Sequence, residues 1–129
     1  MHFQIIGILL IVLAFVHAGF PKRFNWEVEL KALSLINRQM IMVHTFFIAL
    51  IVLMMGILCL TSAQDLSTTA FGKRISFGLG IFWSIRFVIQ FFGYSSKLWK
   101  GKKFETSMHI LFSCFWAYLS FVFLMTYFQ

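Results

Sequence analysis

Four long runs of apolar residues constrain this chain more than any other feature of its sequence. They lie near residues 3–20, 40–60, 75–92 and 108–127, and each is close to the ~20 residues that a helix needs to cross a bilayer core. Apolar and polar residues do not alternate in these runs, and four strands could not close a barrel. The sequence therefore predicts an all-α protein, a four-helix transmembrane bundle of up-down topology in a single domain over residues 1–129.

The composition indicates that lipid is the main solvent. Of the 129 residues, 60% are hydrophobic and only 12% are charged, and a soluble domain of this size could not bury so much apolar surface. The net charge of +7 would suit nucleic acid, but most basic residues lie in two short loops, as in membrane proteins. We therefore expect no nucleic-acid partner. The thiols of Cys59 and Cys114 lie at different predicted depths, so no disulfide is expected.

The basic residues also predict the orientation of the chain. The first and third loops carry eight of them, whereas the second loop carries only Lys73 and Arg74. Because cytoplasmic loops are rich in Lys and Arg, we expect a multi-pass protein of a bacterial-type inner membrane, with both termini outside the cytoplasm. Trp26 and Trp99 would then lie at the cytoplasmic interface. The eight basic residues are Lys22, Arg23, Lys31, Arg38, Lys97, Lys100, Lys102 and Lys103.

The first loop has a helical pattern of its own. Asn25 is a residue type favoured at helix N-caps, and Trp26, Leu30 and Leu33 follow it at helical spacing. This pattern predicts a short amphipathic helix that lies in the membrane interface between the first and second spans.

Polar residues inside the apolar runs predict the position of a site. Arg86 and Gln90 interrupt the third run, and such residues usually face other helices rather than lipid. Helices rise ~1.5 Å per residue. On this scale, each run has at least one polar residue at the same depth in the membrane, near the cytoplasmic face. We expect these side chains to meet inside the bundle with two aromatic neighbours. The candidate residues are Arg86, Gln90, His44, His109, His17, Glu105, Trp83 and Trp116.

The preferred occupant of this cluster has a polar head and an apolar body, as a quinone or a lipid has. Arg86 and Gln90 would bind the head, and the rings of Trp83 and Trp116 would contact the body. The function that the sequence favours is therefore that of a small integral membrane protein that binds an amphipathic ligand or cofactor.

Two histidine-based sites are alternatives. Haem b could be ligated by His44 and His109, because the second and fourth helices face each other across an up-down bundle. A metal could be bound by the three intramembrane histidines and Glu105, although no H-x-x-x-H or H-x-x-E-H spacing supports it. A metal-dependent membrane enzyme is the least favoured interpretation, since such an enzyme would normally need more ligands than three histidines and one Glu.

A purely structural role competes with all of these. The polar residues of the cluster would then only cross-link the helices, and the chain would be a non-catalytic scaffold or accessory subunit. Its partners would be lipids and a larger membrane complex or further copies of itself.

Small residues recur at every fourth position, at Gly72, Ser76, Gly80 and Ser84. This spacing predicts that the backbone of another helix approaches the third helix closely.

Overall fold

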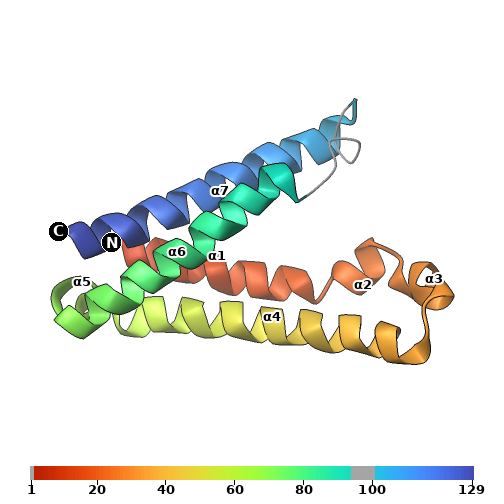
Figure 1. The fold of residues 1–129 in the computed structure, drawn as a ribbon, viewed down its shortest axis with the longest axis horizontal. Coiled ribbons are helices and arrows are strands. Elements are labelled where there is room, and N and C mark those ends of the chain that lie inside the picture. The colour runs from red at the N-terminus through yellow and green to blue at the C-terminus, as the bar shows by residue number, and fades with distance from the viewer. Residues whose placement is uncertain (1, 94–100) are drawn as a thin grey trace. The chain divides into compact units, whose positions relative to one another are not determined.

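The computed structural model describes residues 2–93 and 101–129, and nearly all of them are helical (Figure 1). No strand occurs among the described residues, so the all-α prediction is confirmed for them. Lys97, Trp99 and Lys100 of the predicted basic loop lie outside the described residues. The elements in order are α1 (His2–His17), α2 (Phe20–Arg23), α3 (Trp26–Glu29), the 3-10 helix η1 (Leu30–Ala32), α4 (Leu35–Thr61), α5 (Ala63–Thr68), α6 (Ala70–Phe92) and α7 (Lys103–Phe128).

Three of the described helices are long and apolar enough to cross a membrane, namely α4, α6 and α7. Each includes one predicted apolar run and extends beyond it. Helix α1 is apolar but has only 16 residues, a length of ~24 Å against the ~30 Å of a hydrocarbon core. By length and composition, then, three of the described helices could cross a membrane, and one further apolar helix is shorter.

Helix α1 ends three residues before the predicted end of the first run, and Pro21 explains why. A proline within a continuous helix lacks the N–H that would bond the His17 carbonyl, and its ring clashes with that carbonyl. The two residues that follow α1 close it with tighter i→i−3 bonds, to the carbonyls of Phe15 and Val16. Helix α2 then places Pro21 in its first turn, where no amide hydrogen is needed.

The segment predicted as one interfacial helix is broken into short pieces. Helix α3 begins at Trp26, as predicted, and η1 follows it directly, but the chain is extended again at Leu33 and Ser34. Asn25 occupies the N-cap position with a left-handed backbone (φ 57°), and its side chain makes no capping bond. A capping bond is present at the start of α4, where the backbone N–H of Asn37 donates to Ser34 Oγ at 3.4 Å.

The chain divides into two compact units, Met1–Ala63 and Gln64–Gln129, here called the N-terminal and C-terminal hairpins. In the N-terminal hairpin α1 packs antiparallel to α4 (Figure 1). The two backbones meet at Gly7 and Gly56, where a Cβ atom added to Gly56 would lie 2.8 Å from the Gly7 carbonyl oxygen. The buried apolar side chains of this hairpin are Phe3, Ile6, Leu10, Leu13, Ala14, Val52 and Cys59.

In the C-terminal hairpin α6 packs antiparallel to α7. The ammonium of Lys73, at the start of α6, donates to the carbonyl of Gln129, after the end of α7, at 3.2 Å. An aromatic contact also joins the two helices, with the ring centres of Phe77 on α6 and Tyr127 on α7 4.6 Å apart. The end of α6 and the start of α7, with the basic residues Lys102 and Lys103, thus lie at the end of the hairpin opposite to Lys73.

The predicted small-residue series lies on the packed face of α6. Gly72, Ser76 and Gly80 are buried. Gly72 faces the backbone of Asp65 in α5, and a Cβ atom on Gly80 would lie 2.7 Å from the Leu124 side chain of α7. The Ser76 hydroxyl donates to the carbonyl of Leu66 at 3.1 Å. The close approach that these residues predict is therefore confirmed within this hairpin.

Candidate functional site

Four of the predicted site residues meet in the C-terminal hairpin around the side chain of Gln90. The Gln90 carbonyl oxygen accepts from Arg86 Nη1 at 3.1 Å and from Trp116 Nε1 at 3.3 Å. The Gln90 amide nitrogen donates to His109 Nδ1 at 3.0 Å. These four residues, called the Gln90 network below, join α6 to α7 through a residue that is 7% exposed.

The Gln90 network determines where His109 carries its proton. Because two N–H donors point at the Gln90 oxygen, the amide group of Gln90 must turn its NH₂ toward His109. Nδ1 of His109 is then an acceptor, so a neutral ring carries its hydrogen on Nε2. In this geometry Nε2 presents a hydrogen-bond donor rather than the lone pair that an iron or zinc ion requires. The predicted haem site would have to break this arrangement.

Two stacked indoles support the Gln90 network from one side. The rings of Trp83 and Trp116 lie 5.0 Å apart and are nearly parallel, at 11°, and both residues are buried. The guanidinium carbon of Arg86 lies 5.0 Å from the Trp116 ring centre, within the range of a cation–π contact. The Arg86 guanidinium therefore contacts the side-chain oxygen of Gln90 and the indole face of Trp116.

The remaining predicted residues do not join the Gln90 network within this hairpin. Glu105 is exposed near the start of α7, and the residue bonded to His109 Nδ1 is Gln90 rather than Glu105. His17 and His44 belong to the N-terminal hairpin, where His44 is exposed on α4. In the described parts of either hairpin, no three His, Cys, Asp or Glu residues gather as a metal site would need. A meeting of all four runs, and with it the haem site of His44 and His109, stays a prediction.

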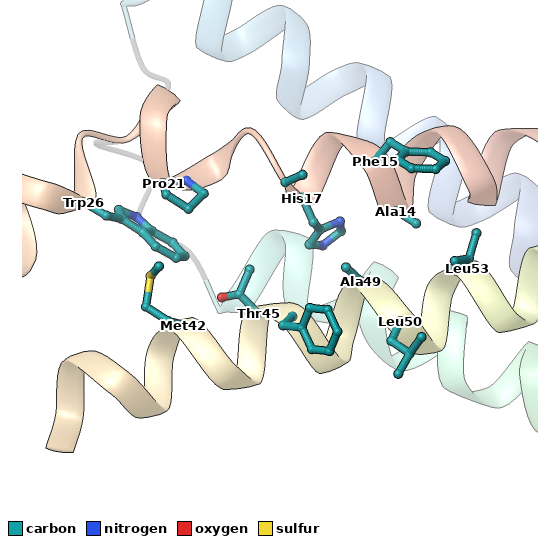
Figure 2. Close-up of a pocket in the computed structure, with 12 residues that line it drawn as sticks. Ala14, Phe15, His17, Pro21, Trp26, Met42, Thr45, Ala49, Leu50 and Leu53 are labelled. Atoms are coloured by element: carbon teal, nitrogen blue, oxygen red, sulfur yellow. The ribbon is translucent and has the colours of Figure 1, made fainter.

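His17 lines a groove of about 290 Å³ between α1 and α4 (Figure 2). Apart from the His17 ring, the Thr45 hydroxyl and the indole nitrogen of Trp26, the side chains that line this groove are apolar. Figure 2 shows the His17 ring pointing from α1 toward α4, with Trp26 and Pro21 at one end of the groove. The lining residues are Ala14, Phe15, His17, Ala18, Pro21, Trp26, Met42, Thr45, Phe46, Ala49, Leu50 and Leu53.

The tautomer of His17 is the opposite of that of His109. Nδ1 of His17 lies 2.8 Å from the Leu13 carbonyl oxygen, and a carbonyl can only accept, so Nδ1 carries the hydrogen. The neutral ring then has a lone pair on Nε2. The Phe20 ring, 4.7 Å from the imidazole, packs beside it. His17 therefore offers the groove a hydrogen-bond acceptor.

A second, more polar hollow of about 710 Å³ adjoins the groove and shares Pro21, Trp26 and Met42 with it. Its other lining residues are Lys22, Asn25, Glu27, Leu30 and Arg38. Arg38 is half-buried, and its Nε is buried without a hydrogen-bond partner among the described residues. A groove with apolar walls thus continues into a hollow that contains two cations.

Sequence reasoning missed this second feature. It assigned Lys22 and Arg38 to membrane orientation, because basic loop residues serve that purpose in most membrane proteins. The residue that could have indicated the hollow is Pro21. It ends α1 and so allows α2 and α3 to fold beside the start of α4. No family model, curated protein or solved structure matches the chain, so the functional case rests on this geometry.

Proposed function

We propose that this chain is a small integral membrane protein that binds an amphipathic, lipid-like ligand in the groove of its N-terminal hairpin. The observation that carries the proposal is the change of character along this one surface. An apolar groove between two helices ends at Trp26 and opens there into a polar, basic hollow. A molecule with an apolar chain and a polar head changes from apolar to polar along its length in the same way.

Polar contacts must supply the selectivity of such a site. In a membrane, an apolar chain gains little by moving from lipid into an apolar groove, because lipid tails are as apolar as leucine. The hydroxyl of Thr45 and the acceptor Nε2 of His17 are the polar groups available between α1 and α4. A ligand that presents a hydroxyl or amide N–H near the junction of its head and chain would satisfy the His17 lone pair.

The Gln90 network is, in this proposal, a lock between α6 and α7 rather than the binding site for the ligand head. The Gln90 side chain uses its oxygen and its nitrogen for three contacts inside the hairpin. Buried polar groups that satisfy one another in this way join transmembrane helices. The same contacts explain how Arg86 is accommodated inside an apolar helix.

We further propose that both hairpins cross an inner membrane, with four spans, cytoplasmic turns and external termini. The segment between α1 and α4 carries Lys22, Arg23 and Lys31, and Lys102 and Lys103 lie at the start of α7. The opposite end of the C-terminal hairpin carries only Lys73 and Arg74 as basic residues. The excess of positive charge at the turns supports this orientation.

Cysteine labelling tests the orientation. In a cysteine-free background (Cys59→Ala with Cys114→Ser), a membrane-impermeant maleimide added to spheroplasts should label Thr68→Cys but not Lys102→Cys. Both positions are exposed, so the difference reports the side of the membrane. Lysis should make Lys102→Cys reactive. Labelling of Lys102→Cys in intact spheroplasts would reverse the orientation.

Filling the groove tests the ligand. Ala49 lines the groove from α4, and Ala49→Phe places a ring where the apolar chain would lie. We expect the variant to retain at least tenfold less co-purifying lipid, as judged by native mass spectrometry of the purified chain. Val43→Phe, at an exposed position of the same helix, is the matched control and should retain the wild-type amount. Equal retention by both variants would contradict the proposal.

A further inference from the structure

The geometry of the hollow points to a more specific ligand: we infer that the amphiphile in the groove is a lipid with an anionic phosphate head, which Arg38 and Lys22 bind in the hollow. This inference rests on the proposed function, because it places the apolar chain of the same lipid in the groove. It adds the chemical class of the head and the residues that recognise it.

Arg38 is the central residue of this inference. It lies in the first turn of α4 and contributes to the wall of the hollow. Its Nε is buried without a hydrogen-bond partner among the residues that the structure describes, and leaving a buried donor unsatisfied is unfavourable. Guanidinium N–H groups form a planar fork that matches two oxygens of a phosphate. A phosphate head in the hollow would accept from guanidinium N–H groups of Arg38, which lines it, and would balance the charge of Arg38.

The charges around the hollow favour an anion over a zwitterion. Lys22, from α2, adds a second cation, and the amide of Asn25 adds neutral donors. Glu27 is the one carboxylate among the lining residues. It forms no ion pair with Lys22 or Arg38 in the described structure, so neither cation is neutralised by it. Two cations and one carboxylate leave the lining with an excess of positive charge.

The position of the hollow favours a membrane lipid over a free phosphate ion. The hollow adjoins the groove at Pro21, Trp26 and Met42, so a head bound by Arg38 can continue into an apolar chain that passes Trp26. Tryptophan is enriched at the depth where lipid heads meet lipid chains. One molecule can therefore occupy both spaces, whereas inorganic phosphate would leave the groove without its apolar occupant.

The test compares two probes that differ only in the head. Purified full-length protein in a neutral detergent is titrated with a monoalkyl phosphate and with the alkyl phosphocholine of the same chain length, and binding is measured by native mass spectrometry. We expect the wild-type protein to prefer the alkyl phosphate by about tenfold, the scale of one charge-assisted hydrogen-bonded contact. Inorganic phosphate at the same concentration should not displace it.

Substitutions then locate the preference. Arg38→Gln should bring the ratio of the two affinities close to one while the alkyl phosphocholine still binds, and Arg38→Lys should retain part of the preference. Glu27→Gln should increase the affinity for the alkyl phosphate, because it removes the carboxylate that repels the head. Arg74→Gln, which removes an exposed cation from the C-terminal hairpin, is the control and should leave the ratio unchanged.

The outcomes separate this inference from the proposed function. A wild-type protein that binds both probes equally, with binding lost in Ala49→Phe, would overturn the phosphate head but keep the groove. An equal loss of preference in Arg38→Gln and Arg74→Gln would also overturn it, since the effect would then be one of net charge. If neither probe bound the wild-type protein, the proposed function itself would be overturned.

Discussion

Replacing Gln90 with leucine should lower the free energy of unfolding by about 2–4 kcal/mol. The estimate follows from the three hydrogen bonds that end on this one side chain. Two of these bonds, to His109 and Trp116, join α6 to α7, and each such bond contributes ~0.6–1.7 kcal/mol. Leucine would in addition remove the oxygen that accepts from Arg86 and Trp116. Unfolding in mixed micelles, followed by circular dichroism as the denaturing detergent fraction rises, measures the change.

Ser120→Ala is the matched control for this prediction. Ser120 is also a buried polar residue of the same hairpin, but its hydroxyl donates to the Trp116 carbonyl within its own helix, at 2.8 Å. Its loss breaks no contact between helices, and we expect a change below ~1 kcal/mol. If Gln90→Leu proves no more destabilising than Ser120→Ala, the Gln90 network does not hold α6 to α7.

The second large effect is expected at the glycine contact of the N-terminal hairpin. Gly56→Leu should destabilise this hairpin by about 3 kcal/mol, because overpacking at a closed contact forces the backbones apart. Even the first side-chain carbon would lie 2.8 Å from the Gly7 carbonyl oxygen and 3.2 Å from the Ile11 amide nitrogen. Neither of these is the flexible end of a side chain, so neither can move without shifting α1. The same detergent titration reports the loss of helix packing.

Gly78→Leu provides the comparison, because nothing lies within 4 Å of a Cβ atom at Gly78. Leucine is the better helix former, so this variant should be as stable as the wild-type protein or slightly more stable. A Gly56→Leu protein that unfolds at the same detergent fraction as Gly78→Leu would show that α1 and α4 do not pack at this distance.

Helical periodicity accounts for the part of the site that could be predicted. A spacing of three or four residues places Gly80, Trp83 and Gln90 on one side of a helix, and the structure buries all three on α6. The same spacing aligns His109 with Trp116 on α7, and both contact Gln90. Which residues share a face depends only on residues of one helix, and the burial of that face follows from the cost of exposing polar groups to lipid.

The partners of each polar side chain could not be predicted in the same way. Glu105 and His109 lie four residues apart and therefore share one face of a helix, yet the contact to His109 Nδ1 comes from Gln90, nineteen positions away. Helical spacing says which residues share a face, whereas the register between two helices decides which faces meet. That register depends on the packing of small residues such as Gly80 against Leu124.

The sequence by itself determined that this chain is helical, that it has apolar runs long enough to cross a membrane, and that polar residues gather on single helix faces, since these properties follow from composition and periodicity. That three of the described helices, and not α1, reach the length of a span was seen only in the structure. Only the tertiary structure decided that Gln90 rather than Glu105 bonds His109, that His17 and His109 carry their protons on different nitrogens, and that Arg38 borders a hollow. These depend on where chain segments distant in sequence are brought into contact. A break at Pro21 and a closed contact at Gly56 set that arrangement in the N-terminal hairpin, and no local pattern encodes the distances that result.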